Sequence, residues 1–168
     1  MKIYFAENEK DPALIESLAK EIWIEHFTPI VGKPQVEYML DKFQSKKAIS
    51  EQIDNAGYLY YIIEDGDEKI GYFAFVPQGR ELFLSKIYVK SSGRKKGHGK
   101  KATQFIVSFC KENGLDNISL TVNKNNTTSI KFYEKMGFKN TGSLMQDIGN
   151  GFVMDDYKME KNILPDQN

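Results

Sequence analysis

The chain has 168 residues, of which 40% are hydrophobic and 27% are charged, and its formal net charge is zero. This size and composition predict one soluble domain, residues 1–168, with a continuous core, and the zero net charge argues against a general nucleic-acid binder. The single cysteine, Cys110, excludes an internal disulfide and a cysteine-rich zinc site.

The first third of the chain predicts a short strand followed by three helices. Ile3–Phe5 has strand character, and Asp11, which a proline follows, predicts the N-cap of a helix. Apolar residues then recur at helical spacing as far as Phe27. The segment 29–34, with a proline at each end, should break this pattern. Two shorter helices are expected after it, over residues 36–43 and 48–53.

The rest of the chain alternates between strand and helix patterns. Aromatic and β-branched residues predict two strands joined by a turn at 64–67, and Asn150-Gly151 predicts the turn of a final hairpin. The expected strands are 58–63, 70–76, 82–89, 118–122, a stretch from Phe138 and 152–159, and the expected helices are 100–113 and 128–136. The tail 164–168 should be loose. The resulting order, βααα-ββ-β-α-β-α-β-β, predicts an α/β (α+β) fold with one strand–helix–strand crossover.

The charges are unevenly distributed along the chain. Residues 1–85 contain 15 acids and 9 bases, a net charge of −6, whereas residues 86–168 contain 8 acids and 14 bases, a net charge of +6. No acid occurs between Leu82 and Lys111. The pattern predicts a basic ligand-binding half and an acidic half able to accept a cationic substrate. Chance variation of surface charge would also explain the acidic half.

A basic, glycine-containing turn, Arg-Lys-Lys-Gly-His-Gly at residues 94–99, lies between the expected strand 82–89 and the expected helix 100–113. A strand that enters a helix through glycines exposes unpaired backbone N–H groups at the helix N-terminus, where the dipole also places partial positive charge. Glycine permits close approach of a ligand and a positive φ. The turn therefore predicts a site for a phosphate-bearing ligand.

Three kinds of glycine-containing loop bind phosphate groups and could explain this turn. A Walker loop would need glycine at position 94 and Ser or Thr at position 101, where this chain has arginine and lysine. The segment 97–102 fits the dinucleotide pattern G-x-G-x-x-A, but residues 123–126 after the next strand offer no acid for a ribose. An antiparallel first half is also unlike a doubly wound sheet, which disfavours a nucleotide-dependent oxidoreductase. The third kind is an acyl-CoA loop.

Three segments resemble motifs of the GNAT superfamily of acyl-CoA N-acyltransferases. Arg94-x-x-Gly97-x-Gly99 resembles its pyrophosphate motif R/Q-x-x-G-x-G/A, and residues 84–89 lie where its central strand precedes that motif. Residues 126–138 resemble the signature N-x-x-(A/S)-x-x-(F/Y)-Y-x-x-x-G-F. The motifs are collinear, so the chain is identified as a member over residues 70–138. The resemblance implies a mixed, mostly antiparallel central sheet flanked by helices, with a strand–loop–helix acyl-CoA site.

The resemblance also implies acetyl-CoA as co-substrate and the residues that bind it. Phosphates would be bound by cationic side chains and by loop amides, His98 acting through its backbone. The backbone of the central strand would pair with pantetheine as an added half-strand, because the family's strand splays from its neighbour there. The cations are Arg94, Lys95, Lys96, Lys100 and Lys101; the amides are those of Gly97, His98 and Gly99; the strand residues are Ile87, Tyr88 and Val89. Asn126 would hydrogen-bond to pantetheine, although its position equally predicts a helix N-cap.

Tyr133 is the residue to which the resemblance assigns catalysis. A thiol has a pKa of about 8.5 and a phenol of about 10, so a tyrosine hydroxyl can donate a hydrogen bond or proton as the C–S bond breaks. As an aromatic residue on a helix, Tyr133 could instead belong to the core.

The acceptor amine must lose a proton before it can attack. The sequence offers several candidates for the general base that takes this proton. Members of the family often carry a glutamate on the central strand near the position where this chain has Ser85. Glu25, His26 and Glu81 are the candidates, and His26 also fits a structural role at a helix end. No His, Asp or Glu set has metal-ligand spacing, so no metal is expected.

The acceptor site of the family is variable and lies where this chain has residues 22–27, 38–43 and 149–161. These segments are similar to those of PaiA-like polyamine N-acetyltransferases. We therefore expect acetyl transfer to a primary amine of a small cationic acceptor, by direct attack in a ternary complex. Ordinary helix packing explains the same apolar residues. Alternative acceptors are a protein N-terminus or lysine, an amino acid and an aminoglycoside, and a non-catalytic acyl-CoA sensor is a further alternative.

The remaining expectations concern location and partners. The N-terminal residues do not have the pattern of a signal peptide, and no apolar run approaches the ~20 residues of a membrane helix. A cytoplasmic protein without a membrane partner is therefore expected. The bases gather on one loop without interleaved exposed aromatics, which argues against RNA or DNA as a partner. The terminal hairpins offer strand edges through which a homodimer could form.

Overall fold

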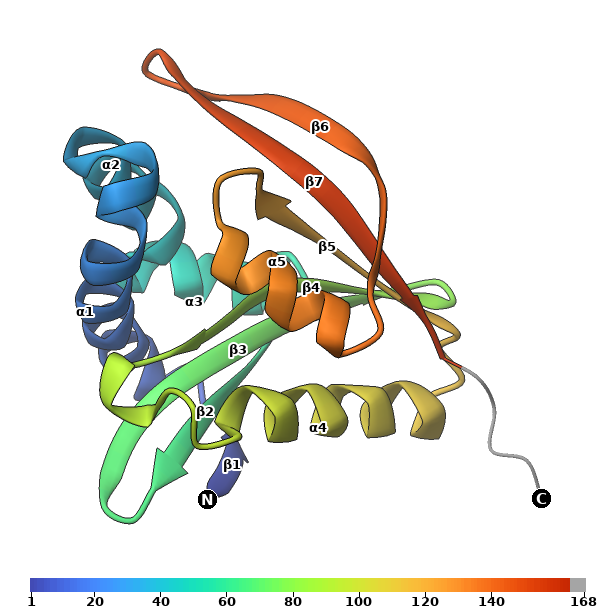
Figure 1. Cartoon of the computed structure of the whole chain (residues 1–168). Helices are drawn as coiled ribbons and strands as arrows, with labels where there is room; N and C mark the ends of the chain where they lie inside the picture. Colours follow the sequence, from blue (N-terminus) through green and yellow to red (C-terminus); the bar gives the residue numbers. More distant parts are fainter. Residues whose placement is uncertain (164–168) are drawn as a thin grey trace. The chain divides into compact units, whose positions relative to one another are not determined.

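The structure, a computed structural model, describes residues 1–163 (Figure 1), and the tail predicted to be loose lies outside this range. The predicted order of strands and helices is confirmed. Its elements are β1 (Lys2–Phe5), α1 (Asp11–Val31), α2 (Lys33–Gln44), α3 (Lys46–Asn55), β2 (Leu59–Asp65), β3 (Glu68–Gln78), β4 (Glu81–Val89), the 3-10 turn η1 (Ser91–Gly93), α4 (His98–Glu112), β5 (Asn117–Asn123), α5 (Thr127–Lys135), β6 (Lys139–Gly149) and β7 (Phe152–Asn162).

The chain divides into two compact units. The first comprises Met1–Val76 and Lys86–Ala102, and the second comprises Pro77–Ser85 and the residues from Thr103 onward. The strands of the first unit follow the order β1-β2-β3-β4, and those of the second follow the order β4-β5-β7-β6. Because β4 contributes to both units, the strands make up one seven-stranded sheet. The α/β class is thereby confirmed, and the single domain 1–168 stays a prediction.

The sheet is mostly antiparallel, as predicted. The pairs β1–β2, β2–β3, β5–β7 and β6–β7 are antiparallel, and β4–β5 is parallel. The parallel register is short, from Glu81 opposite Asn117 to Phe83 opposite Ser119. By contrast, β5 stays paired with β7 as far as Asn123, which lies opposite Asp156. The central strand β4 therefore changes its environment partway along its length, which the acyl-CoA resemblance implies.

The core of the first unit forms where α1 packs on aromatic side chains of the sheet. Ile15, Ile22 and Trp23 are buried along one face of this helix, at the spacing that predicted it. The Trp23 indole Nε1 donates to the Tyr72 hydroxyl at 3.1 Å, which in turn donates to Gln44 Oε1. The buried polar atoms of this cluster are thus paired, as burial requires.

One local prediction near α1 is wrong, and a second is confirmed. Asp11 is the first helical residue rather than the N-cap, and its carboxylate accepts from the Glu7 backbone N–H at 2.7 Å instead. The predicted break within residues 29–34 is confirmed. It occurs at Gly32, which has φ +86°, because α1 continues through Pro29 to Val31 and α2 begins at Lys33. A proline removes one backbone donor, and here the helix ends two residues later, so the loss is confined to its last turn.

Strands β3 and β4 approach each other closely at Gly71. A Cβ built on Gly71 would lie 2.3 Å from the Tyr88 carbonyl oxygen and 3.1 Å from Val89 Cα. The Lys90 backbone N–H donates to the Ile70 carbonyl at 2.7 Å next to this contact. Because the atoms in the way are backbone, no rotamer change can relieve the clash.

We expect Gly71→Ala to lower the free energy of unfolding by about 1–3 kcal/mol, the usual cost of overpacking, because β3 and β4 must move apart. Urea unfolding of the two proteins measures this. Gly142→Ala in β6 is the matched control, since a Cβ there meets nothing within 4 Å. Equal stabilities for Gly71→Ala and the wild type would refute the close approach.

Candidate active site

The basic turn joins β4 to α4 through two residues with positive φ. Helix α4 begins at His98, two residues before the predicted start, so His98 and Gly99 belong to its first turn rather than to the loop. Lys95 has φ +63° and Gly97 has φ +79°. A non-glycine residue rarely adopts such a backbone, and it marks a turn held by its surroundings. The N-terminus of α4, where the helix dipole places partial positive charge, suits an anion.

Several bonds hold the start of this turn against the end of β4 and against α1. Arg94 Nε donates to the Val89 carbonyl at 3.1 Å. The Ser91 hydroxyl donates to Glu25 Oε2 at 3.2 Å, and Lys90 Nζ lies 3.1 Å from Glu21 Oε2. The turn is therefore fixed in place by contacts within the first unit.

His98 contributes more than its backbone. Its imidazole is buried, with Nδ1 3.0 Å from Met1 Sδ and Nε2 3.2 Å from Asp65 Oδ2. The ring therefore packs against Met1, which precedes β1, and against Asp65 at the end of β2, so the side chain of His98 has a structural role that the sequence did not indicate. The sequence carried no signal for this contact, because Met1 and Asp65 are far from His98 along the chain. The backbone role of His98 towards a ligand stays a prediction.

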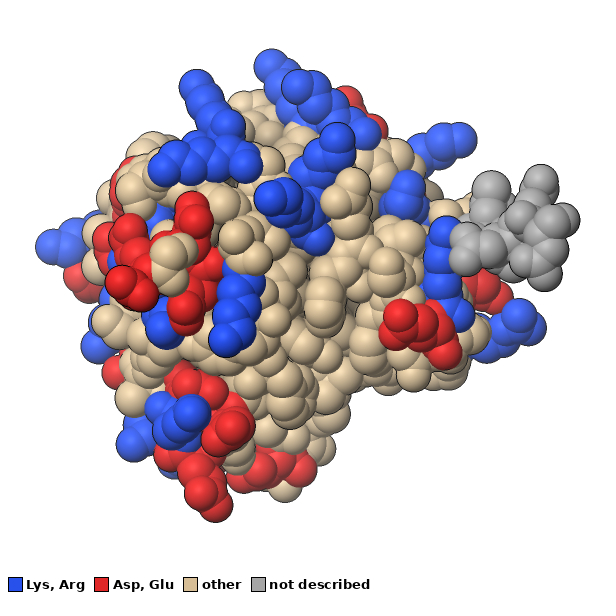
Figure 2. Space-filling model, turned by 90° about the horizontal axis from the view of Figure 1, so that it is seen from below, with Lys and Arg blue, Asp and Glu red and all other residues tan. Residues whose placement is uncertain are grey.

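The cations of the turn remain available to a ligand. Arg94, Lys95, Lys96, Lys100 and Lys101 are exposed, and none of them forms an ion pair within the described residues. Acids and bases both lie on the face shown in Figure 2, so the surface as a whole is not of one sign. A local excess of cations around helix-terminal amides is an arrangement that binds phosphate groups.

Asn126 and Tyr133 lie together on α5 in the second unit. Asn126 is buried and is the N-cap, since its side-chain oxygen accepts from the Ser129 N–H at 3.4 Å, which confirms the N-cap interpretation. The half-buried ring of Tyr133 makes edge contacts with Phe132 and Phe138, each with centroids 5.5 Å apart. Burial raises the pKa of Tyr133 well above its usual 10. Its hydroxyl therefore stays protonated at neutral pH and can donate.

The predicted site residues thus fall into two groups. The first unit brings together the end of β4, Ile87–Val89, and the turn 94–100 that follows it. The second unit holds Asn126 and Tyr133. The Val89 carbonyl, which the resemblance assigned to pantetheine, already accepts a hydrogen bond from Arg94.

The candidate bases differ in their surroundings. Glu81 lies at the start of β4, where its carboxylate accepts from Asn117 Nδ2 at 3.0 Å, six residues before Ile87. Six residues of extended chain span about 20 Å, so Glu81 is remote from the end of its strand. The His26 ring makes an edge contact with Phe27, with centroids 4.8 Å apart. Glu25 accepts from Ser91 beside the basic turn.

The aromatic residues assigned to the acceptor region include core residues. Trp23 and Phe27 are only 4% and 8% exposed. Their rings contact Tyr88, with centroids 5.3 and 5.8 Å apart. Packing therefore accounts for these two side chains, as the alternative interpretation held.

Two buried charged residues were missed by the sequence reasoning. Lys86 on β4 is 7% exposed and Asp156 on β7 is 4% exposed. For Lys86 a signal existed, because strand side chains alternate and Leu82 and Leu84 place position 86 on the buried face. For Asp156 the surrounding pattern of β7 is mixed, and no comparable signal was available.

Lys86 sits in a polar cluster within the first unit. Its Nζ donates to Gln52 Oε1 at 3.2 Å, the atom that also accepts from the Tyr60 hydroxyl. The ammonium lies 4.7 Å from the ring centroid of Tyr58 and 5.4 Å from that of Tyr60. Burial lowers the pKa of Lys86 from 10.5 to about 7. The folded protein can thus release this proton near neutral pH.

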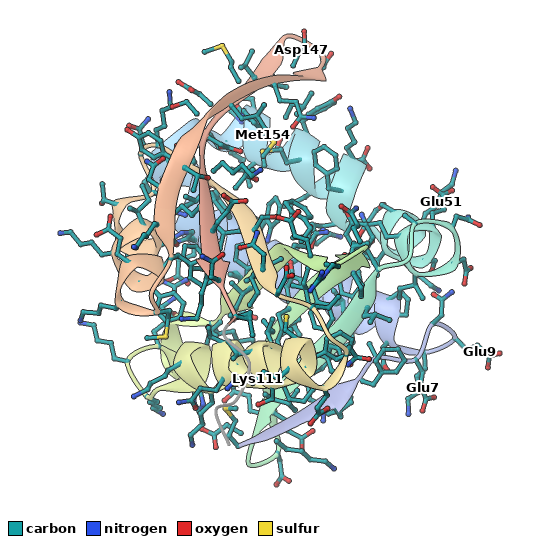
Figure 3. All side chains as sticks on the ribbon, turned by 90° about the vertical axis from the view of Figure 1, so that its right-hand side faces the viewer. Glu7, Glu9, Glu51, Lys111, Asp147 and Met154 are labelled. Atoms are coloured by element: carbon teal, nitrogen blue, oxygen red, sulfur yellow. The ribbon has the colours of Figure 1, made fainter. Side chains whose placement is uncertain are left out.

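An open hollow on α2 and α3 does not coincide with the predicted site. Its lining residues are Lys42, Ala48, Glu51, Gln52, Asn55 and Ala56. Glu51 projects outward there in Figure 3. Within residues 1–163, no group of three or more His, Cys, Asp or Glu side chains is placed to hold a metal ion. In the same part of the chain, no helix has the length and apolar character needed to cross a membrane.

Comparison with known proteins gives a consistent result. The sequence profile of the acetyltransferase (GNAT) family matches residues 16–138. N-acetyltransferase family 8 member 2 of Rattus norvegicus is 25% identical over 111 residues, which cover 62% of this chain and 49% of that protein. The peptidyl-lysine N-acetyltransferase YjaB of Salmonella typhimurium is 26% identical over 97 residues, 57% of this chain and 61% of that protein. The chain thus spans about half the length of the first of these curated relatives.

A solved structure shares the fold. The PaiA N-acetyltransferase of Thermoplasma acidophilum, crystallised with coenzyme A, superposes with a TM-score of 0.76. The superposition covers 96% of this chain and 99% of that one at 21% identity. At this identity the likeness shows the fold alone, and it matches the mixed sheet described above.

We expect Lys86→Met to stabilise the protein most below pH 7. Between pH 7 and 10.5 the unfolded chain binds the Lys86 proton and the folded chain does not, so wild-type stability rises with pH. The advantage of the variant should therefore shrink by about 1.4 kcal/mol per pH unit over this window. Urea unfolding at pH 6.5, 8 and 9.5 measures it. Lys47→Met, at an exposed position, is the control, and a difference independent of pH would contradict the burial of a titrating amine.

Proposed function

The chain belongs to the acetyltransferase (GNAT) family, and from this premise we propose that it transfers an acetyl group from acetyl-CoA to a primary amine. The acceptor is a small cationic, polyamine-like molecule, and the amine attacks directly in a ternary complex. The observation that carries the proposal is the basic turn 94–100, whose exposed cations lie next in sequence to the N-terminus of α4 and form no ion pair within the described residues. We also propose that the protein is cytoplasmic and that its terminal hairpins allow a homodimer to form.

Acetyl-CoA is the ligand that the turn suits by its chemistry. Its phosphate groups are polyanionic, and they match the exposed cations from Arg94 to Lys101 together with the amides of Gly97, His98 and Gly99. The amides of pantetheine match the backbone of Ile87, Tyr88 and Val89, and Asn126 supplies a further side-chain hydrogen bond. These assignments rest on the family motifs in the sequence and on the local geometry of each unit.

Tyr133 has the properties required to protonate the leaving group. Its hydroxyl is kept protonated by burial, and the thiolate formed on C–S cleavage is a strong acceptor. A proton or hydrogen bond delivered to sulfur stabilises the transition state more than the ground state, which is the condition for raising kcat.

A small cationic acceptor is supported by the excess of acids in residues 1–85 and by the similarity of the acceptor segments to polyamine N-acetyltransferases. Its rivals within the family are protein N-termini or lysines, amino acids and aminoglycosides. The name of the YjaB relative, a peptidyl-lysine N-acetyltransferase, keeps a lysine acceptor among them. These acceptors differ in size and charge, so one assay separates them.

We expect release of free CoA thiol from acetyl-CoA to be fastest with polyamines. Spermidine, spermine, amino acids, an aminoglycoside and a lysine peptide are each compared with a reaction lacking amine. Arg94→Glu, which reverses a charge of the turn, is the control and should lose acetyl-CoA binding more than amine binding. Turnover concentrated on another amine would reject the polyamine acceptor. Acetyl-CoA binding without turnover on any amine would favour a sensor.

We expect Tyr133→Phe to lower kcat by about 100-fold, because the proton donor to sulfur is removed while the ring is kept. The Kd for acetyl-CoA, measured by calorimetry, should stay within about twofold. Tyr157→Phe in β7 is the control, since it removes a hydroxyl from the same unit. A wild-type kcat for Tyr133→Phe would show that Tyr133 serves packing alone.

A further inference from the structure

Asp156 on β7 carries a buried carboxylate whose bonding is incomplete. The residue is 4% exposed, and its Oδ1 accepts no hydrogen bond within residues 1–163. A buried polar atom without a partner costs free energy, and such atoms are few in native proteins. Lys86, the other buried charge discussed above, is by contrast bonded to Gln52. Asp156 therefore has the character of a functional group rather than of a structural one.

The strand register places Asp156 beside the β5–α5 turn. It lies directly opposite Asn123, the last residue of β5, at a Cα separation of about 5 Å for such a pair. The carbonyl of Asn123 accepts from the Asn126 N–H at 2.9 Å, and its side-chain oxygen accepts from the Asn125 N–H at 2.8 Å. This rigid turn leads into α5, which carries Tyr133. All of these residues belong to one compact unit.

The charges around Asp156 leave it without a cationic partner. Its neighbour Asp155 is paired with Lys124 at 3.0 Å, and Lys158, two residues further on, is paired with Glu160 at 3.6 Å. The paired strand β5 has the sequence NISLTVN and no ionisable side chain. On β6, Lys139 and Asp147 stand near the two ends of the strand, and Leu144 lies opposite Asp156. In Figure 3, Asp147 is labelled at the tip of the β6–β7 hairpin.

This setting favours proton exchange near neutral pH. Burial, and secondarily the charge of Asp155, raise the pKa of Asp156 from 3.8 to about 6. A general base works best with a pKa close to the operating pH, whereas an ordinary aspartate is too weak a base. A free alkyl ammonium has a pKa of about 10 and must be deprotonated before it attacks.

We propose that Asp156 binds the acceptor ammonium and takes its proton, a role that rests on the proposed function. The ammonium gives one proton to the carboxylate, and the neutral amine attacks the thioester carbonyl carbon. A C–N bond forms and the C–S bond breaks as the electron pair leaves on sulfur. Tyr133 gives its proton to the sulfur and regains one from the nitrogen, and Asp156 returns its proton to solvent. The products are the amide, CoA thiol and one proton.

The test is Asp156→Asn, which keeps the shape and removes the base. With spermidine, we expect kcat/KM at pH 7 to fall at least about 100-fold. The residual rate should then rise about tenfold per pH unit towards the pKa of the amine, because the free amine no longer needs a base. The wild type should instead lose activity as the pH falls through 6. A purely structural role would not produce this recovery at high pH.

Control variants separate the remaining explanations. Asp155→Asn changes the adjacent carboxylate, which already has a cationic partner. It should keep kcat/KM at pH 7 and should move only the acidic limb of the profile to lower pH, because the charge of Asp155 contributes to the raised pKa of Asp156. Asp156→Ser repeats the test with a smaller side chain should the asparagine variant fold poorly, as judged by its thermal unfolding. A kcat/KM for Asp156→Asn within threefold of wild type, or an equal loss at every pH, overturns the role of Asp156 while acetyl transfer stands.

Calorimetric titration with spermidine distinguishes this inference from the proposed function. We expect Asp156→Asn to weaken spermidine binding at least tenfold and to leave the Kd for acetyl-CoA unchanged. If the wild type acetylates no amine, the proposed function is rejected. Spermidine binding that depends on Asp156 would then still support an amine site. Equal spermidine binding by the two proteins, or none by either, overturns the assignment of Asp156 as the group that holds the ammonium.

Discussion

The site depends on how the backbone of β4 is paired along its length. Its parallel register with β5 covers Glu81–Phe83, while its far end is pressed against β3 so closely that Gly71 has no room for a Cβ. Backbone donors and acceptors must find partners when buried. At the end of β4 they are supplied by Arg94 and Ile70, and this pins the turn. The first turn of α4 follows at a fixed position, at the helix end whose partial positive charge suits an anion.

Exposed cations add charge to this backbone arrangement, and the four lysines among them form no ion pair within the described residues. Arg94 differs from these lysines, because its Nε closes the turn onto Val89 while its charge remains at the surface. His98 has the complementary role, because its buried ring holds the start of α4 beside Met1 and the end of β2. The turn is thus held by a few polar contacts and one buried imidazole, which leaves the lysines to the ligand.

Lys86 and Asp156 show how differently a fold can treat a buried charged group. Lys86 is compensated by Gln52 and by the faces of two tyrosine rings, so its environment favours a stable polar cluster. Asp156 Oδ1 has no hydrogen-bond partner, although burying a carboxylate also costs free energy. Departures from local rules of this kind tend to occur at functional sites. A complementary cation is the partner that its charge would attract.

Much of the fold could be predicted from local patterns. Period-two and helical spacing of apolar residues identified each strand and helix in order, and the motif around Arg94 identified the turn. Local reasoning failed at Asp11, which is the first residue of α1 and not its N-cap. It also underestimated His98, whose ring contacts Met1 and Asp65, because contacts between distant residues have no local signature.

The sequence by itself determined the element order, the basic turn, the N-cap of α5 and the family, because each of these is encoded by neighbouring residues. Only the tertiary structure decided that Trp23 and Phe27 pack on Tyr88, that Lys86 meets Gln52, and that Asp156 lies opposite Asn123. The physical reason is that burial and hydrogen-bond pairing depend on strand register and helix packing, which bring together residues that are far apart in the chain.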